Sequence, residues 1–137
     1  MTVSEIHDAL ANTALYYFIL LAAWGSFRFL RKQGVDSSFW GALVIAEILL
    51  AVQFLLGGYM WVIGLRPARN VHLLYGLVSL LALPGMFMYT KGRSERPEML
   101  MYAVICLVLV GVLLRAIFTG EVQLPEVWRL PLLSLVL

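Results

Sequence analysis

Four long apolar stretches dominate this sequence, and they constrain its fold more than any other feature. They are residues 9–30, 39–63, 71–90 and 99–118. Each reaches the roughly 20 residues that an α-helix needs to cross the hydrocarbon core of a bilayer. Of the 137 residues, 62% are hydrophobic and 13% are charged, so a chain of this size cannot hide its apolar surface in a water-soluble core. The sequence therefore predicts a polytopic membrane protein.

The segments between these stretches are short and carry charges and helix breakers. They are residues 31–38, 64–70 and 91–97. Short connections make consecutive helices antiparallel, so we expect an all-α, up-down four-helix transmembrane bundle over residues 1–120. Ser37 or Ser38 is the expected N-cap of the second helix, and Asn70 that of the third. Pro97 suits the first turn of the fourth helix.

Residues 121–137 form a short apolar C-terminal tail. Its last eight residues, 130–137, carry no charge but are too few to span a bilayer. Trp128 and Arg129 are typical of the headgroup region. Two interpretations remain open for the tail. It either folds back onto the membrane interface or packs against another subunit, since an exposed apolar end favours association.

Lysine and arginine are distributed unevenly between the two expected faces of the bundle. One face holds six of them and the other holds four, and the first group surrounds residues 31–38 and 91–97. The six are Arg28, Arg31, Lys32, Lys91, Arg93 and Arg96, and the four are Arg66, Arg69, Arg115 and Arg129. Because basic loops stay in the cytoplasm, we expect a multi-pass protein of a cell inner membrane or a plasma membrane, with both termini outside (N-out/C-out).

Glu47 is the most deeply placed ionisable residue of the sequence. It lies eight residues past Phe39, which corresponds to about 12 Å of helix and a position near the middle of the bilayer. Ionisable groups at that depth face the bundle interior and pair with another group. Two interpretations remain open: Glu47 accepts a proton or binds a ligand, or its carboxyl only fixes helix contacts.

A second polar level is predicted near the outer surface. Gln53 lies about 21 Å up the second helix, Arg115 about 24 Å up the fourth, and His72 about 3 Å into the third. Tyr75 follows His72 by about one helical turn. His72 also shares a small-residue face of its helix with Gly76 and Ser79, which favours a position inside the bundle. The candidate cluster is Gln53, His72, Tyr75 and Arg115.

The sequence argues against several other kinds of chemistry. A single cysteine, Cys106, excludes an intramolecular disulfide and a multi-cysteine metal site. The net charge of +2 is too small to indicate nucleic-acid binding. We see no catalytic arrangement and expect neither an enzyme nor a metal site. Only His7 and His72 could ligate a haem, and His7 precedes the first expected span, so a single shallow haem is kept only as an alternative.

Several short motifs resemble those of a group of small bacterial integral membrane proteins with four spans. They are Gly41-Ala42-Leu43-Val44-Ile45 followed by Glu47 and Gln53, His72-Leu73-Leu74-Tyr75-Gly76, Gly92-Arg93, and Arg115-Ala116 followed by Thr119-Gly120. The resemblance covers residues 41–120. It implies a four-span membrane fold, and the group brings no assigned activity with it.

Two functional hypotheses follow from these features. The first is a non-catalytic auxiliary subunit of a larger membrane complex, with respiratory or photosynthetic electron transfer as a candidate setting. The small size, the apolar tail and the small-residue helix faces motivate it. The second is a self-contained binder of quinone, lipid or a single b-type haem at the outer-leaflet cluster. In both cases the bilayer is the surrounding solvent.

Overall fold

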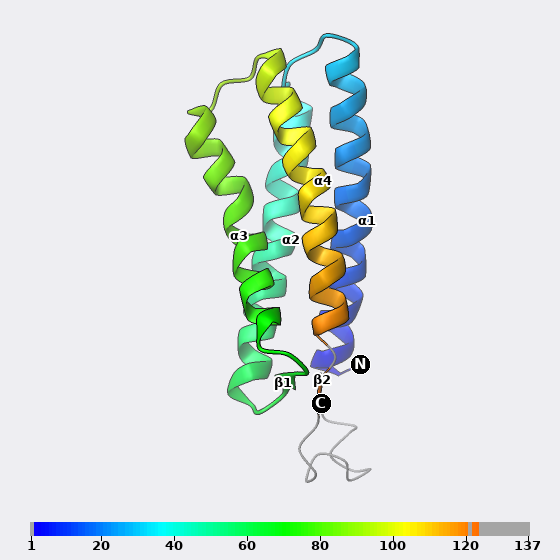
Figure 1. Cartoon of the computed structure of the whole chain (residues 1–137), viewed down its shortest axis with the longest axis vertical. Helices are drawn as coiled ribbons and strands as arrows, with labels where there is room; N and C mark the ends of the chain where they lie inside the picture. The colour runs from blue at the N-terminus through cyan, green and yellow to red at the C-terminus, as the bar shows by residue number, and fades with distance from the viewer. Residues whose placement is uncertain (1, 121, 124–137) are drawn as a thin grey trace.

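The structure is a computed structural model, and it describes residues 2–120 and 122–123. Four antiparallel helices run the length of the molecule: α1 (Val3–Leu30), α2 (Ser37–Val62), α3 (Val71–Thr90) and α4 (Arg96–Thr119) (Figure 1). Each is long and apolar enough to cross a membrane. The prediction of an all-α, up-down four-helix bundle of a multi-pass membrane protein is confirmed.

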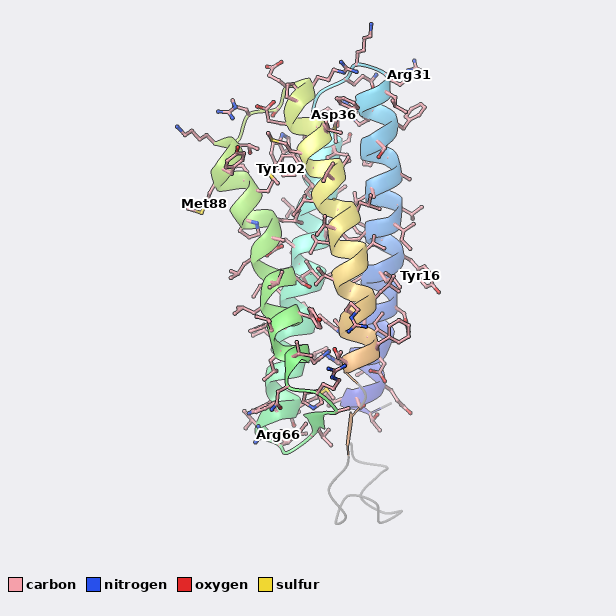
Figure 2. The ribbon with its side chains drawn as sticks, in the orientation of Figure 1. Tyr16, Arg31, Asp36, Arg66, Met88 and Tyr102 are labelled. Atoms are coloured by element: carbon pink, nitrogen blue, oxygen red, sulfur yellow. The ribbon has the colours of Figure 1, made fainter. Side chains whose placement is uncertain are left out.

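The helices pack in chain order around a shared core. The contact between α1 and α4 is the most extensive, and α2 and α3 complete the ring. The largest fully buried side chains include Phe18, Phe39 and Tyr102. Large apolar side chains such as Met88 cover the outer surface instead (Figure 2). An apolar exterior around a packed core is what contact with lipid requires.

Helix α1 begins at Val3, ahead of the apolar stretch that starts at residue 9. The cause is a capping box: Thr2 accepts a hydrogen bond from the backbone N–H of Glu5, and the Glu5 carboxylate accepts one from the backbone N–H of Thr2. These two bonds satisfy amides that otherwise lack partners at a helix start. His7 consequently lies inside α1 and is buried, although the sequence placed it before the first span.

The caps of the other helices agree only in part with expectation. Asp36, rather than Ser37 or Ser38, caps α2, because its carboxylate accepts a 2.8 Å hydrogen bond from the backbone N–H of Phe39. Asn70 holds the N-cap position of α3, but its side chain makes no capping bond. Pro97 lies in the first turn of α4, as predicted.

Small residues let α1 and α4 approach closely in the half of the bundle that holds the end of α1 and the start of α4. A Cβ atom on Gly25 would lie 3.1 Å from Ala103 Cβ and 3.3 Å from Ala103 Cα. Both residues are buried. Close backbone approach at small residues is a common way for membrane helices to associate, so this contact explains why α1 and α4 share the largest interface.

The two loops at one end of the bundle, residues 31–36 and 91–95, are fastened to each other. Val35 N–H donates to the carbonyl of Ser94 at 2.8 Å, and the indole N–H of Trp40 donates to Ser94 Oγ at 3.0 Å. Arg28 reinforces the first loop by donating to the Gly34 carbonyl at 2.7 Å and pairing with Asp36 at 3.2 Å. We call this set of contacts the loop clasp.

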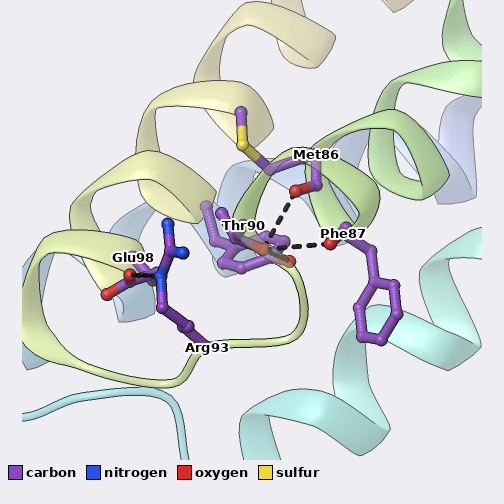
Figure 3. Close-up of polar contacts among 6 residues, drawn as sticks. Met86, Phe87, Thr90, Arg93 and Glu98 are labelled. Atoms are coloured by element: carbon purple, nitrogen blue, oxygen red, sulfur yellow. Dashed lines mark hydrogen bonds and ion pairs between the residues drawn. The ribbon is translucent and has the colours of Figure 1, made fainter.

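Polar side chains continue inward from the loop clasp. Thr90 donates to the carbonyls of Met86 and Phe87, at 3.0 and 3.2 Å, and Arg93 pairs with the buried Glu98 at 2.7 Å (Figure 3). Because the single Thr90 hydroxyl proton is already donated, the Tyr102 hydroxyl donates to Thr90 Oγ1 at 3.1 Å. This end of the bundle is therefore closed by both loops and side chains.

The opposite end carries a short antiparallel pairing instead. Strand β1 (Arg66–Pro67), in the loop between α2 and α3, pairs with β2 (Val122–Gln123), with Arg66 opposite Gln123. The pairing holds the chain that leaves α4 against this loop (Figure 1). The remaining part of the predicted tail, residues 124–137, lies outside the described residues, as does residue 121.

Candidate functional site

A cavity of about 710 Å³ lies in the half of the bundle that holds the start of α1 and strand β1. All four helices contribute to its lining. Apolar walls are formed by residues such as Leu50, Phe54 and Ile117. Among the polar lining residues are His7, Asp8, Gln53, His72 and Ser79. The cavity thus joins an apolar interior to a concentrated set of polar groups.

The two histidines of the chain meet in this cavity. Their ring centroids are 6.2 Å apart, and the planes are inclined by 72° in an edge-to-face arrangement. His7 is 8% exposed, and its Nδ1 is buried without a hydrogen-bond partner among the described residues. His72 is half-buried. A buried nitrogen without a partner is costly unless another molecule supplies one.

The hydrogen bond of His72 defines its tautomer. Nδ1 lies 2.8 Å from the backbone carbonyl oxygen of Ala116 on α4. A carbonyl oxygen only accepts, so Nδ1 carries the proton and donates it. In the neutral ring, Nε2 is then the acceptor. The contact also draws α3 and α4 together beside the cavity.

Gln53 connects α2 to α1 at the same level. Its Nε2 donates to the backbone carbonyl of His7 at 2.7 Å, which establishes which end of the amide is nitrogen. The amide oxygen, Oε1, is buried and has no hydrogen-bond partner in the described part of the chain. Gln53 therefore presents an unused acceptor beside the cavity.

The structure brings together two of the four residues in the predicted cluster. Gln53 and His72 line the cavity, whereas Tyr75 and Arg115 do not belong to its lining. Arg115 lies on the exposed side of α4. The α4 residues that face the cavity follow helical spacing: Leu113, Ala116, Ile117 and Gly120. At 100° per residue, the intervening Arg115 points away from that face.

Tyr75 is half-buried at the margin of the inner face of α3. His72, Gly76 and Ser79 follow the i, i+4, i+7 spacing and all three line the cavity. The small-residue face predicted for this helix is thus on the inside. Tyr75 contributes through its backbone, since its carbonyl accepts a 2.7 Å hydrogen bond from Ser79 Oγ.

Glu47 is separate from the cavity. It is half-buried on α2, and its Oε2 atom is buried with no hydrogen-bond partner among the described residues. The spacing along α2 explains the separation, because Glu47 is turned by about 120° from Gln53 around the helix. The structure supplies no partner for this carboxyl in residues 2–120.

His7 is the site residue that sequence reasoning missed. Its position ahead of the apolar stretch suggested a location outside the helix. The missed signal is Thr2-Val3-Ser4-Glu5, which has the spacing of a capping box and extends the helix toward the N-terminus. With that start, His7 reaches the level of Gln53 and His72.

The lining of the cavity combines uncharged polar groups, two carboxylates and apolar walls. Within the described residues, no group of three or more His, Cys, Asp or Glu side chains could hold a metal ion. The described lining includes the carboxylates of Glu5 and Asp8 but neither lysine nor arginine. Comparisons of the chain with protein-family models, curated proteins and solved structures give no match. The geometry of the cavity therefore carries the functional argument.

Proposed function

We propose that this protein binds a small lipid-soluble molecule in the cavity between its helices. The polar head of the ligand lies against His7, Gln53 and His72, and its apolar part lies against walls such as Leu50 and Phe54. One observation carries the proposal: the lining of a cavity of about 710 Å³ includes two buried polar atoms, His7 Nδ1 and Gln53 Oε1, that have no hydrogen-bond partner among residues 2–120 and 122–123.

Two physical arguments support it. Ligand sites in proteins are mostly apolar cavities of roughly 300–1,000 Å³ with a few placed polar groups. Buried polar groups in folded proteins are nearly always hydrogen-bonded. A ligand head that bonds to His7 and Gln53 would satisfy both unpartnered atoms at once.

The test compares two leucine substitutions on α3. Gly76 lines the cavity, and a Cβ there meets only Phe54 at 3.8 Å, so Gly76→Leu fills the cavity without a backbone clash. Gly85 lies on the exposed side of α3 with no neighbouring heavy atom within 4 Å, so Gly85→Leu is the matched control. Organic extraction of the purified proteins, followed by mass spectrometry, should recover a lipid-soluble molecule from wild type and Gly85→Leu only. Equal recovery from Gly76→Leu would overturn the proposal.

A second candidate ligand is a single b-type haem, and one observation favours it. His72 Nδ1 donates to the Ala116 carbonyl, which leaves Nε2 as a possible metal ligand, and such a backbone hydrogen bond is typical of metal-ligating histidines. An absorption spectrum of the purified protein decides this candidate, because a bound haem gives a Soret band.

We further propose that the cavity lies toward the outer face of the membrane. Supporting this, the loop clasp end carries the basic residues Arg28, Arg31, Lys32, Lys91, Arg93 and Arg96, and basic loops favour the cytoplasm. Cysteine at exposed Gln33 should resist a membrane-impermeant thiol reagent in intact cells, whereas cysteine at exposed Ala68 should react. The native Cys106 is fully buried and does not interfere. The opposite labelling pattern would reverse the orientation.

The auxiliary-subunit hypothesis remains a proposal from the sequence alone. Its test is purification in mild detergent from native membranes, where other membrane subunits should co-migrate with this chain. Recovery of a monodisperse monomer without partners would contradict it, and would leave the ligand proposal unaffected.

A further inference from the structure

Three polar side chains of the cavity each direct one hydrogen away from it, toward a backbone carbonyl. Gln53 Nε2 donates to the His7 carbonyl, His72 Nδ1 to that of Ala116, and Ser79 Oγ to that of Tyr75. The distances are 2.7, 2.8 and 2.7 Å. Because a carbonyl can only accept, none of these three bonds can be reversed.

Each of these three side chains therefore leaves an acceptor for a ligand. Gln53 retains Oε1 together with the second N–H of its amide, neutral His72 retains the lone pair of Nε2, and Ser79 retains the lone pairs of an oxygen whose proton is already donated. Gln53 Oε1 is buried without a partner, and Ser79 is 3% exposed. The carboxylates of Asp8 and Glu5 add further acceptors to the lining.

This pattern selects the head group of the ligand. An anionic head would meet acidic side chains and no lysine or arginine among the described lining residues, so phosphate and carboxylate heads are disfavoured. A head made only of carbonyls can accept from the second N–H of Gln53 or the ring N–H of neutral His7, but it supplies no donor for the acceptors of Gln53, His72 and Ser79. A cationic head would have to leave water, which is expensive within a membrane. A neutral hydroxyl matches the lining, because it can donate to one of these acceptors and accept from one of these N–H groups.

We infer that the cavity binds a hydroxyl-headed lipid-soluble molecule, with the hydroxyl proton donated to one of the acceptors on Gln53, His72 or Ser79. The inference rests on the proposed function and specifies its ligand class. A quinol and a diacylglycerol both have this chemistry, whereas a quinone has acceptors in place of the hydroxyls. A site that requires this hydroxyl donor would bind a quinol more tightly than the corresponding quinone.

The test uses two probes that differ only in the donor. The purified full-length protein is titrated in detergent with an alkylphenol and with the methyl ether of the same alkylphenol, and binding is followed by calorimetry. The phenol should bind roughly tenfold more tightly, because the ether leaves the acceptor of this one hydrogen bond unpaired. Displacement of the phenol by a short-chain quinol or by a diacylglycerol then identifies the source of the hydroxyl.

Substitutions of cavity residues test which acceptor the phenol hydroxyl uses. Ser79→Ala removes one acceptor and leaves the backbone of α3 unchanged. His72→Asn keeps an N–H near the position of Nδ1 for the Ala116 carbonyl and removes Nε2. Removal of the acceptor that the hydroxyl uses should weaken phenol binding severalfold while leaving ether binding unchanged, so at least one of the two variants should show this loss. Tyr75→Phe is the matched control on α3, because the Tyr75 side chain lies outside the cavity lining.

The outcomes separate this inference from the proposed function. Equal binding of phenol and ether, or tighter binding of the ether, overturns the requirement for a donor and leaves the cavity as a ligand site. Displacement of the phenol by a quinone as readily as by the quinol also overturns it. If neither probe binds and organic extraction recovers no ligand, both proposals fail.

Discussion

Gln53 on α2 donates a 2.7 Å hydrogen bond from Nε2 to the backbone carbonyl of His7 on α1. The same amide keeps its oxygen free beside the cavity. One side chain therefore ties two helices together and presents a binding group at the same level. Stability and ligand binding are coupled at this position.

Gln53→Met tests that coupling. The substitution keeps the length of the side chain and removes the amide, so the free energy of unfolding should fall by about 0.5–1.5 kcal/mol, as for other interhelical hydrogen bonds. Reversible unfolding in mixed detergent micelles measures it. Gln33→Met, at an exposed loop position, is the control and should be neutral. A loss no greater than that of the control would show that the bond contributes nothing.

Gly25→Leu should destabilise the bundle through the contact between α1 and α4. Even a Cβ at this position approaches the Ala103 backbone within 3.3 Å, so a leucine must push the helices apart. Overpacking of this kind costs about 1–3 kcal/mol. Gly111→Leu on α4 has open space around it and should change the melting temperature little. Similar melting of the two variants would contradict the close contact.

Arg115→Lys should be nearly silent. Arg115 is exposed on α4 and lies outside the cavity lining, and a lysine of similar length reaches the interface equally well. Thermal melting in detergent and recovery of bound ligand should both match wild type. A reduced ligand content in Arg115→Lys would return this residue to the binding site, since a guanidinium that makes several hydrogen bonds cannot be replaced by lysine.

Trp40 and Ser94 provide a test of the loop clasp. Trp40→Phe keeps an aromatic ring near Tyr102 and removes the indole N–H, and Ser94→Ala removes its acceptor. Each should reduce the free energy of unfolding by about 1 kcal/mol. The double variant should lose less than the sum, because both changes remove the same bond. Strict additivity would mean that the two side chains do not interact.

Hydropathy predicts the helices well because lipid leaves few other structures available. A chain that crosses a bilayer must satisfy its backbone within each span, so apolar length alone indicates α2, α3 and α4 closely. The helix ends depend on local polar bonds instead. The Thr2 and Glu5 capping box extends α1, and Asp36 takes the cap predicted for Ser37 or Ser38.

The sequence predicts only part of the cavity lining, because two of the four residues in the predicted cluster, Gln53 and His72, belong to it. Residue spacing gives height along a helix accurately, which is why Gln53 and His72 meet at one level. The rotation of each helix about its own axis depends on packing against its neighbours. Arg115 lies at the level of the cavity along the bundle axis, but its side of α4 faces away from the cavity. Residue spacing along α4 alone does not show which side of the helix faces inward.

The loop clasp makes the two ends of the bundle mechanically different. One end is held by a hydrogen bond between the two loops, from Val35 to Ser94, and by one from Trp40 of α2 to Ser94, while the other surrounds the cavity. Opening motions start where local contacts are fewest, so the helix ends around His7 and His72 should separate first. Backbone amide protons around His7 and His72 should exchange with solvent well before those beside the loop clasp. A ligand would then enter where these helix ends spread apart, while the end with the loop clasp stays in place.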